Sequence, residues 1–206
     1  MSPRRSSDNL KEVIRDFRRD QVIDVARRLF GERGSTDVSM DEIATEAGVA
    51  RSTVYVYFAN RDELLRACLK RMHTQLLEAL ALVWEGDTDP TSRIHALVGA
   101  MFERLDDNPA FFRLALITQE AVNAGGEAVG SELAMISLDI ARLIRDLYVE
   151  GTQAGKFRSI DPDRATALIG QQIFGAMSIR AAEPLPRPLA EAADEVGDFI
   201  VRGLSA

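Results

Sequence analysis

Residues with catalytic chemistry are few in this 206-residue sequence, and they form no recognisable catalytic or metal-binding set. The spacing of the two histidines, His73 and His95, fits no zinc motif. Cys68 is the only cysteine, which excludes a disulfide or a cysteine-based zinc site within one chain. The acidic pairs at residues 87–89 and 106–107 lie beside Pro or Gly and are typical of solvated turns. We therefore expect no metal, no cofactor and no enzymatic activity.

A different group of residues has the chemistry to bind a polyanion. Arg51, Ser52, Thr53 and Tyr55 are hydrogen-bond donors that lie close together, and Arg61 follows shortly after them. Donors of this kind at the beginning of a helix can face the phosphates and base edges of DNA. A single surface arginine is more often simply solvated, so this prediction depends on the grouping and not on any one residue.

The distribution of charge agrees with such a partner, although the formal total of −7 argues against it. Residues 1–71 contain 14 Lys and Arg against 12 Asp and Glu, net +2, whereas residues 72–206 contain 11 against 20, net −9. This asymmetry is typical of a protein in which only one end meets a polyanion. No export signal and no membrane-spanning segment is evident, so we expect a cytoplasmic protein without a membrane partner.

The elements that must position these donors are helices. Gly34 ends a first amphipathic helix, and Ser39 with Glu42 forms a capping box that begins a second helix. That second helix ends at Gly48, and a third is predicted at residues 51–58. Two short helices around a tight turn are the parts of a helix-turn-helix motif, in which the second helix enters the major groove. A fourth helix is expected to begin after a cap at Asn60.

Over residues 16–76 the sequence resembles the N-terminal DNA-binding domain of the TetR/AcrR transcriptional regulators, with the motif itself at residues 39–58. The resemblance lies in the correctly spaced runs FGERG (30–34), SMDEIA (39–44), AGV (47–49), TVY (53–55), YF (57–58) and RDELL (61–65). We expect residues 1–15 to form a flexible basic arm before this domain.

The resemblance implies a DNA-contacting set in these helices. Its members are Ser39, Arg51, Ser52, Thr53 and Tyr55, with Tyr57 near the sugar–phosphate wall and Arg61 where the family usually places a phosphate-binding lysine. Two positions depart from the family pattern. Ala50 stands where a capping serine is common, and Asp41 stands where some members have a base-contacting arginine. Base readout is therefore expected to depend more heavily on Arg51.

Residues 77–206 are also predicted to be helical, which makes the chain all-α with about nine or ten helices in total. The breaks at Gly and Pro residues predict helices at 75–85, 91–105, 109–122, 131–154, 163–181 and 188–204. By resemblance, this larger part is a ligand-sensing and dimerising bundle. Candidate ligand-binding residues are Trp84, His95, Met101, Phe102, Phe112, Gln119, Met135 and Tyr148.

Two of these helices have apolar faces with small residues that favour close packing, and we expect them to form a homodimer interface. The interface candidates are Leu138, Ala141, Ile144, Ala167, Gly170, Ile173, Phe174 and Met177. The sequence therefore predicts a homodimeric repressor that binds a palindromic double-stranded DNA operator and is released by a small, largely apolar effector. An activator of the same fold, or an architectural DNA binder without a ligand, remains an alternative.

Overall fold

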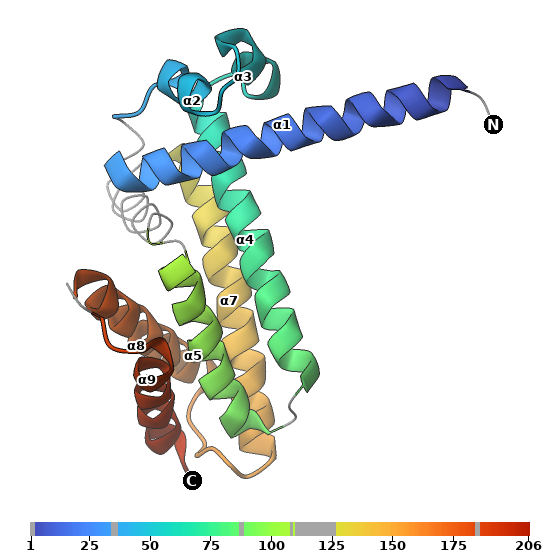
Figure 1. The fold of residues 1–206 in the computed structure, drawn as a ribbon. Helices are drawn as coiled ribbons and strands as arrows, with labels where there is room; N and C mark the ends of the chain where they lie inside the picture. Colours follow the sequence, from blue (N-terminus) through green and yellow to red (C-terminus); the bar gives the residue numbers. More distant parts are fainter. Residues whose placement is uncertain (1–2, 34–36, 87–88, 108, 110–126, 184–185) are drawn as a thin grey trace. The chain divides into compact units, whose positions relative to one another are not determined.

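The computed structural model describes residues 3–33, 37–86, 89–107, 109, 127–183 and 186–206 (Figure 1). Within these ranges the regular secondary structure is helical apart from one isolated β-bridge between Phe157 and Ser205, which confirms the all-α class. The helices are α1 (Pro3–Arg33), α2 (Met40–Glu46), α3 (Arg51–Tyr57), α4 (Arg61–Gly86), α5 (Pro90–Asp107), α7 (Glu127–Gln153), α8 (Pro162–Ala182) and α9 (Leu189–Leu204). None of these helices has the length and apolar character needed to cross a membrane.

Several helix boundaries differ from the sequence-based expectations. The helix predicted at 75–85 is the C-terminal part of α4, which is continuous from Arg61 to Gly86. Residues 3–15, expected as a flexible arm, belong to α1, which begins with Pro3 and meets no Gly or Pro before Gly31. Helix α7 begins at Glu127 and not at residue 131. The helix predicted at 109–122 lies outside the described residues, apart from Pro109.

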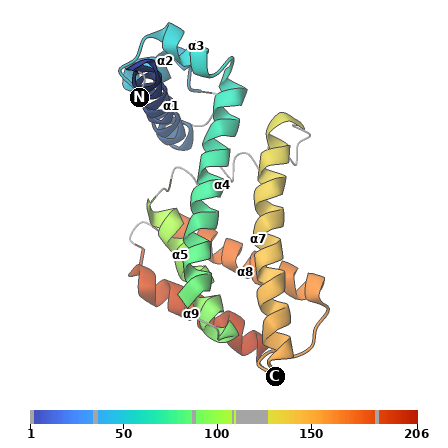
Figure 2. The ribbon, with the colours of Figure 1, turned by 90° about the vertical axis from the view of Figure 1, so that its right-hand side faces the viewer.

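The chain divides into two compact units at Met72, and residues 127–132 belong with the first of them. In the first unit α1 packs on α2 and α3, and α3 leads through a short linker into α4 (Figure 2). Its core is formed by apolar side chains from all four helices and includes Phe30, Ile43, Val54, Phe58 and Leu64. Burial of these side chains fixes α2 and α3 against α1.

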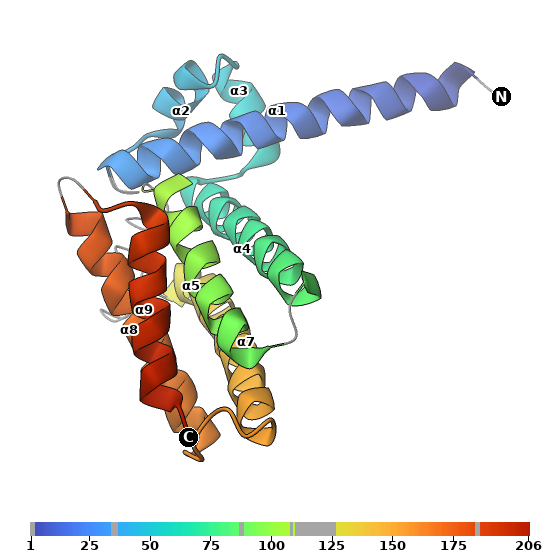
Figure 3. The same cartoon turned by 60° about the horizontal axis from the view of Figure 1, so that its bottom comes forward.

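The second unit contains the rest of the described chain, in which α5 packs against α8 and α9 (Figure 3). An ion pair joins the C-terminal end of α5 to α8. Arg180 on α8 is buried, and its Nε lies 2.8 Å from Asp106 Oδ1. Asp106 was expected in a solvated turn, but here it partners a buried guanidinium on α8. A buried charge needs such a partner, so this ion pair fixes the end of α5 to α8.

Candidate nucleic-acid interface

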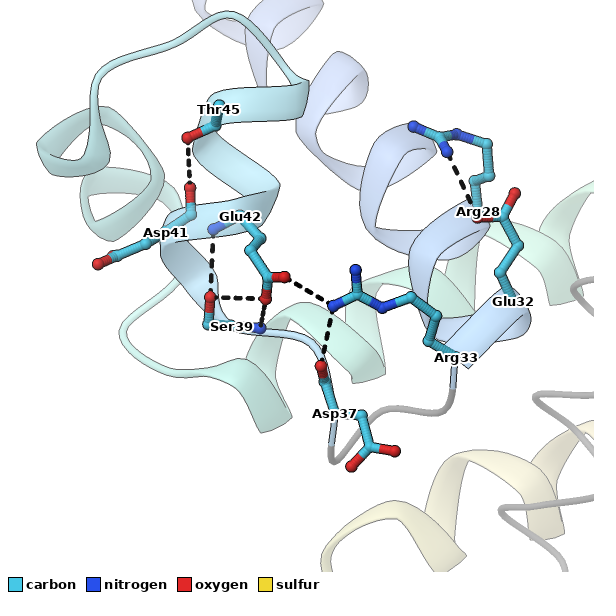
Figure 4. Close-up of polar contacts among 8 residues, drawn as sticks. All are labelled: Arg28, Glu32, Arg33, Asp37, Ser39, Asp41, Glu42 and Thr45. Carbon is cyan, nitrogen blue, oxygen red and sulfur yellow. Dashed lines mark hydrogen bonds and ion pairs between the residues drawn. The ribbon is translucent and has the colours of Figure 1, made fainter.

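Helix α2 begins with a reciprocal cap that also binds the end of α1 (Figure 4). Ser39 Oγ accepts from the Glu42 backbone N–H at 3.2 Å, and the Ser39 backbone N–H donates to Glu42 Oε2 at 2.9 Å. Arg33 then donates to Glu42 Oε1 at 2.7 Å and to the Asp37 carbonyl at 3.0 Å. The predicted capping box is confirmed, and it joins two helices of the unit.

The charges at this cap reinforce one another. Hydrogen bonds from Arg33 first, and from Ser39 second, lower the pKa of Glu42 from about 4.5 to about 2. The same contact with Glu42 raises the pKa of Arg33. Both groups therefore stay charged throughout the physiological range, and the cap is maintained by an ionised carboxylate at the N-terminus of α2.

The turn between α2 and α3 depends on Gly48, whose φ of 63° lies in the left-handed region. The Gly48 N–H donates to the Thr45 carbonyl at 3.1 Å, and the Val49 N–H donates to the Ala44 carbonyl at 3.0 Å. This pair of bonds is the Schellman arrangement that ends helices. It turns the chain sharply, so that α3 begins only a few residues after α2 has ended.

Helix α3 has one buried face and one exposed face. Val54 is fully buried, which anchors the helix to the core, while Arg51, Ser52, Tyr55 and Val56 are exposed. Ala50 provides no side-chain cap, as the sequence indicated. The exposed face presents hydrogen-bond donors together with one apolar side chain, and this combination suits the polar edges and thymine methyl groups of a major groove.

The Arg51 side chain is held by two neighbours. Its Nε lies 2.8 Å from Asp41 Oδ1, and its guanidinium carbon lies 5.5 Å from the centre of the Tyr55 ring. Interaction with Tyr55 first, and with Asp41 second, raises the pKa of Arg51. The arginine is therefore a permanent cation in a defined position on the surface of the motif.

The beginning of α4 is capped by the predicted residue, Asn60. Asn60 Oδ1 accepts from the Glu63 N–H at 2.9 Å, and Glu63 Oε2 accepts from the Ala59 N–H at 2.7 Å. Arg61 is the first residue of α4 and is half-buried. These two bonds fix the backbone on both sides of Asn60, next to the second cation of the predicted site.

The seven residues predicted to contact DNA lie at the cap of α2, on α3 and at the start of α4, all in the first unit. Ser39 is exposed, but its hydroxyl serves the cap of α2. Sequence reasoning missed Val56, which is 77% exposed, and the contact of Asp41 with Arg51. The sequence did contain a signal for Val56, because this valine falls at a position of α3 that the helical periodicity leaves exposed. The exposed set comprises Arg51, Ser52 and Tyr55, and the half-buried set comprises Thr53, Tyr57 and Arg61.

The described residues among those predicted to bind a ligand belong to the second unit, and several of them have structural roles there. Tyr148 is buried, and its hydroxyl lies 2.7–3.0 Å from backbone groups of residues 158–160. Phe102 is buried beneath the Arg180 guanidinium. His95 faces Asp194 and Asp198 on α9. Trp84 and Met101 are half-buried, Met135 is exposed, and Phe112 and Gln119 lie outside the described residues.

The residues predicted for the dimer interface fall into two groups. Ile144, Ile173 and Met177 are buried within the chain, so their side chains have no surface to offer a partner. Gly170 lies near Ile144 of the same chain, at a distance where an added Cβ atom would make an ordinary van der Waals contact with the Ile144 side chain. Leu138, Ala167 and Phe174 are exposed, and Ala141 and Gly170 are half-buried.

An open groove of about 930 Å³ lies along α8 and α9 in the second unit. Its walls include large apolar side chains that face solvent: Ile179 and Phe199 are each 66% exposed, and Leu168 is 52% exposed. None of the described residues that were predicted to bind a ligand lines this groove. An exposed apolar surface of this kind marks a site of association.

The motif and its exposed donors define a helix-turn-helix protein of the DNA-binding class. Comparison with known families agrees: residues 22–68 match "Bacterial regulatory proteins, tetR family", and residues 90–182 match "Tetracyclin repressor-like, C-terminal domain". The chain belongs to the TetR family of transcriptional regulators, whose members are regulators and not enzymes.

Two related proteins and one solved structure illustrate the similarity. An HTH-type transcriptional regulator of Mycobacterium tuberculosis is 30% identical over 124 residues, which are 60% of each chain. The transcriptional activator FasR of Mycolicibacterium smegmatis is 34% identical over 48% of this chain and 46% of its own length. The matches thus span less than two thirds of these relatives. The crystal structure of FadR from Bacillus subtilis in complex with stearoyl-CoA has the same fold, with a TM-score of 0.78, 21% identity and coverage of 89% and 98% of the two chains.

The cap of α2 makes stability dependent on pH in a defined direction. Glu42→Gln is expected to lower the melting temperature at pH 7, because the ionised carboxylate contributes stability above its unfolded pKa near 4.5. This difference from wild type should shrink as the pH falls from about 4.5 towards about 2 and the carboxylate protonates. Thermal unfolding followed by circular dichroism measures it. Glu32→Gln, at an exposed position of α1, is the control, and a pH-independent difference for Glu42→Gln would contradict this account.

Proposed function

We propose that this protein is a cytoplasmic transcriptional regulator that inserts α3 into the major groove of its operator. The observation that supports this most directly is the two-faced α3, which is anchored by buried Val54 and presents Arg51, Ser52 and Tyr55 outward. In helix-turn-helix proteins the second helix contacts base edges, and flanking groups contact phosphates. Arg61 at the capped start of α4 is the proposed phosphate contact.

We further propose that the regulator is a homodimer that binds a palindromic operator. Two copies of α3 about 34 Å apart would occupy successive major grooves. The groove on α8 and α9 supports a two-fold interface, because exposed Phe199 and Ile179 lie beside charges of both signs, Asp198 and Arg202. A two-fold contact must be self-complementary, and such a surface meets this requirement. This proposal differs from the interface on α7 and α8 expected from the sequence, in which Ile144, Ile173 and Met177 are buried within the chain.

The regulation that we propose is release of a repressor by a largely apolar effector that binds the second unit. FadR, which has the same fold, was solved in complex with stearoyl-CoA, and this supports an amphiphilic effector with a long apolar chain. Release requires that the effector binds more tightly to a conformation that is unsuited to DNA. The relative FasR is an activator, so activation through the same DNA contacts is the second candidate function.

The DNA assignment predicts that Arg51→Ala combined with Tyr55→Ala abolishes specific operator binding. Both side chains lie on the exposed face of α3, so the fold and the oligomeric state should be unchanged. An operator selected from random duplexes by the wild-type protein, followed by gel retardation, measures the loss. We expect affinity to fall towards that for scrambled DNA, and retained specific retardation by the double variant would refute the assignment.

The interface assignment predicts that Phe199→Glu weakens the dimer by about 30-fold or more, the effect of losing a hot-spot residue of about 2 kcal/mol. Sedimentation over a range of concentrations measures the dissociation constant. Leu138→Glu is the matched control, because Leu138 is also an exposed apolar residue but lies on α7, in the interface expected from the sequence. If Leu138→Glu separates the subunits and Phe199→Glu does not, the interface is formed by α7.

The effector assignment predicts that stearoyl-CoA releases the wild-type protein from the selected operator, whereas free coenzyme A does not. The contrast tests whether the apolar chain is the recognised part. Fluorescence anisotropy of labelled operator measures the release. Unchanged operator binding across a series of acyl-CoA chain lengths would reject an acyl effector and favour a ligand-independent DNA binder.

A further inference from the structure

Asp41 occupies an unexpected position for an acidic residue in a surface that meets DNA. It lies in the first turn of α2 and is 53% exposed, beside Arg51, which is 65% exposed. Its carboxylate points away from the Ser39–Glu42 cap (Figure 4). The cap uses Glu42, and only the main-chain carbonyl of Asp41 is bonded within α2, by the Thr45 hydroxyl at 2.9 Å. The Asp41 carboxylate is thus directed to Arg51 on the neighbouring helix.

The geometry of this contact suits base recognition by Arg51. Asp41 Oδ1 lies 2.8 Å from Nε, at the inner side of the guanidinium, and the Tyr55 ring lies beneath the same group. The two terminal nitrogens of the guanidinium lie beyond the Nε that faces Asp41. Two parallel donors in a fixed fork are what a guanine O6 and N7 accept.

We propose that Asp41 is a positioning residue for specificity, which holds Arg51 in the orientation that selects one base pair in each operator half-site. This inference rests on the proposed operator-binding function. Arginine has many rotamers, and a side chain held before binding loses less freedom when the complex forms. Asp41 and the Tyr55 ring hold Arg51 from two sides, so both the direction and the plane of the guanidinium are restricted.

Stability of the fold does not explain the pair. Ion pairs between side chains this exposed contribute little to folding. A carboxylate near the phosphates also weakens binding to every duplex, because it repels them. Asp41 is therefore unfavourable for general DNA affinity and favourable for discrimination between sequences. Its neutral variant is expected to bind DNA more tightly and select it less well.

The test uses the full-length protein and a random duplex library. Wild-type protein, Asp41→Asn and the control Asp62→Asn each select from this library, and the enriched sequences give the preference at every position. Asp62 is a suitable match because it is exposed and lies in the first turn of another capped helix, α4, so both variants lose one negative charge of the same kind. Circular dichroism melting verifies that each variant is folded.

We expect Asp41→Asn to lose about fivefold or more of its preference at one base pair in each half-site, the range for a bidentate arginine contact, with other positions unchanged. Its affinity for scrambled duplex should rise. In an Arg51→Ala background the Asp41→Asn change should have no further effect on that position. Asp41→Glu, which keeps the charge, should restore part of the preference.

Two results would overturn the inference while leaving the proposed function intact. One is an equal response of Asp41→Asn and Asp62→Asn, which would reduce Asp41 to a general repulsive charge. The other is an effect of Asp41→Asn that persists without Arg51. If the wild-type protein itself enriches no sequence, the operator-binding function fails, and this outcome is distinguishable from both.

Discussion

The left-handed turn at Gly48 is the constraint on which the DNA-binding unit depends. A residue with a Cβ atom is disfavoured at its φ of 63°, and the hydrogen bonds to Ala44 and Thr45 end α2 at that point. Because the turn is tight, α3 leaves at an angle that buries Val54 and brings Arg51 beside Asp41. The cap at the other end of α2 fixes this arrangement to α1, so two short local structures define which face of α3 is exposed.

Such local structures are encoded by neighbouring residues, and this is why the sequence predicted them. Ser39 with Glu42, Gly48 and Asn60 each act within a few positions of the chain. The contact between Arg51 and Asp41 was not predictable, because it depends on the angle between two helices. In the second unit the helical periodicity of the sequence indicated an apolar helix face around Ile144. The sequence alone does not determine whether such a face packs within the chain or against a second subunit. That Ile144 is buried and Phe199 is exposed could be determined only from the three-dimensional structure.

The division of charge between the two parts of the chain also acquires a structural meaning. Arg33 and Arg28 pair with Glu42 and Glu46, so these arginines join α1 to α2. The net charge of +2 over residues 1–71 is therefore a poor measure of what a phosphate would meet. The relevant cations are Arg51 on α3 and Arg61 at the start of α4, and a small number of phosphate contacts implies a moderate dependence of DNA affinity on salt.

The missing side-chain cap at Ala50 has a consequence for local stability. Both helices have seven residues, but α2 begins with a reciprocal cap, whereas α3 has no side-chain bond to its first N–H groups. Opening of α3 therefore requires less free energy than opening of α2, and its amides should exchange with solvent sooner. Helix α3, which is proposed to enter the major groove, can therefore change its backbone conformation at a lower cost in free energy than α2. Helix α2 is expected to stay fixed while α3 adjusts.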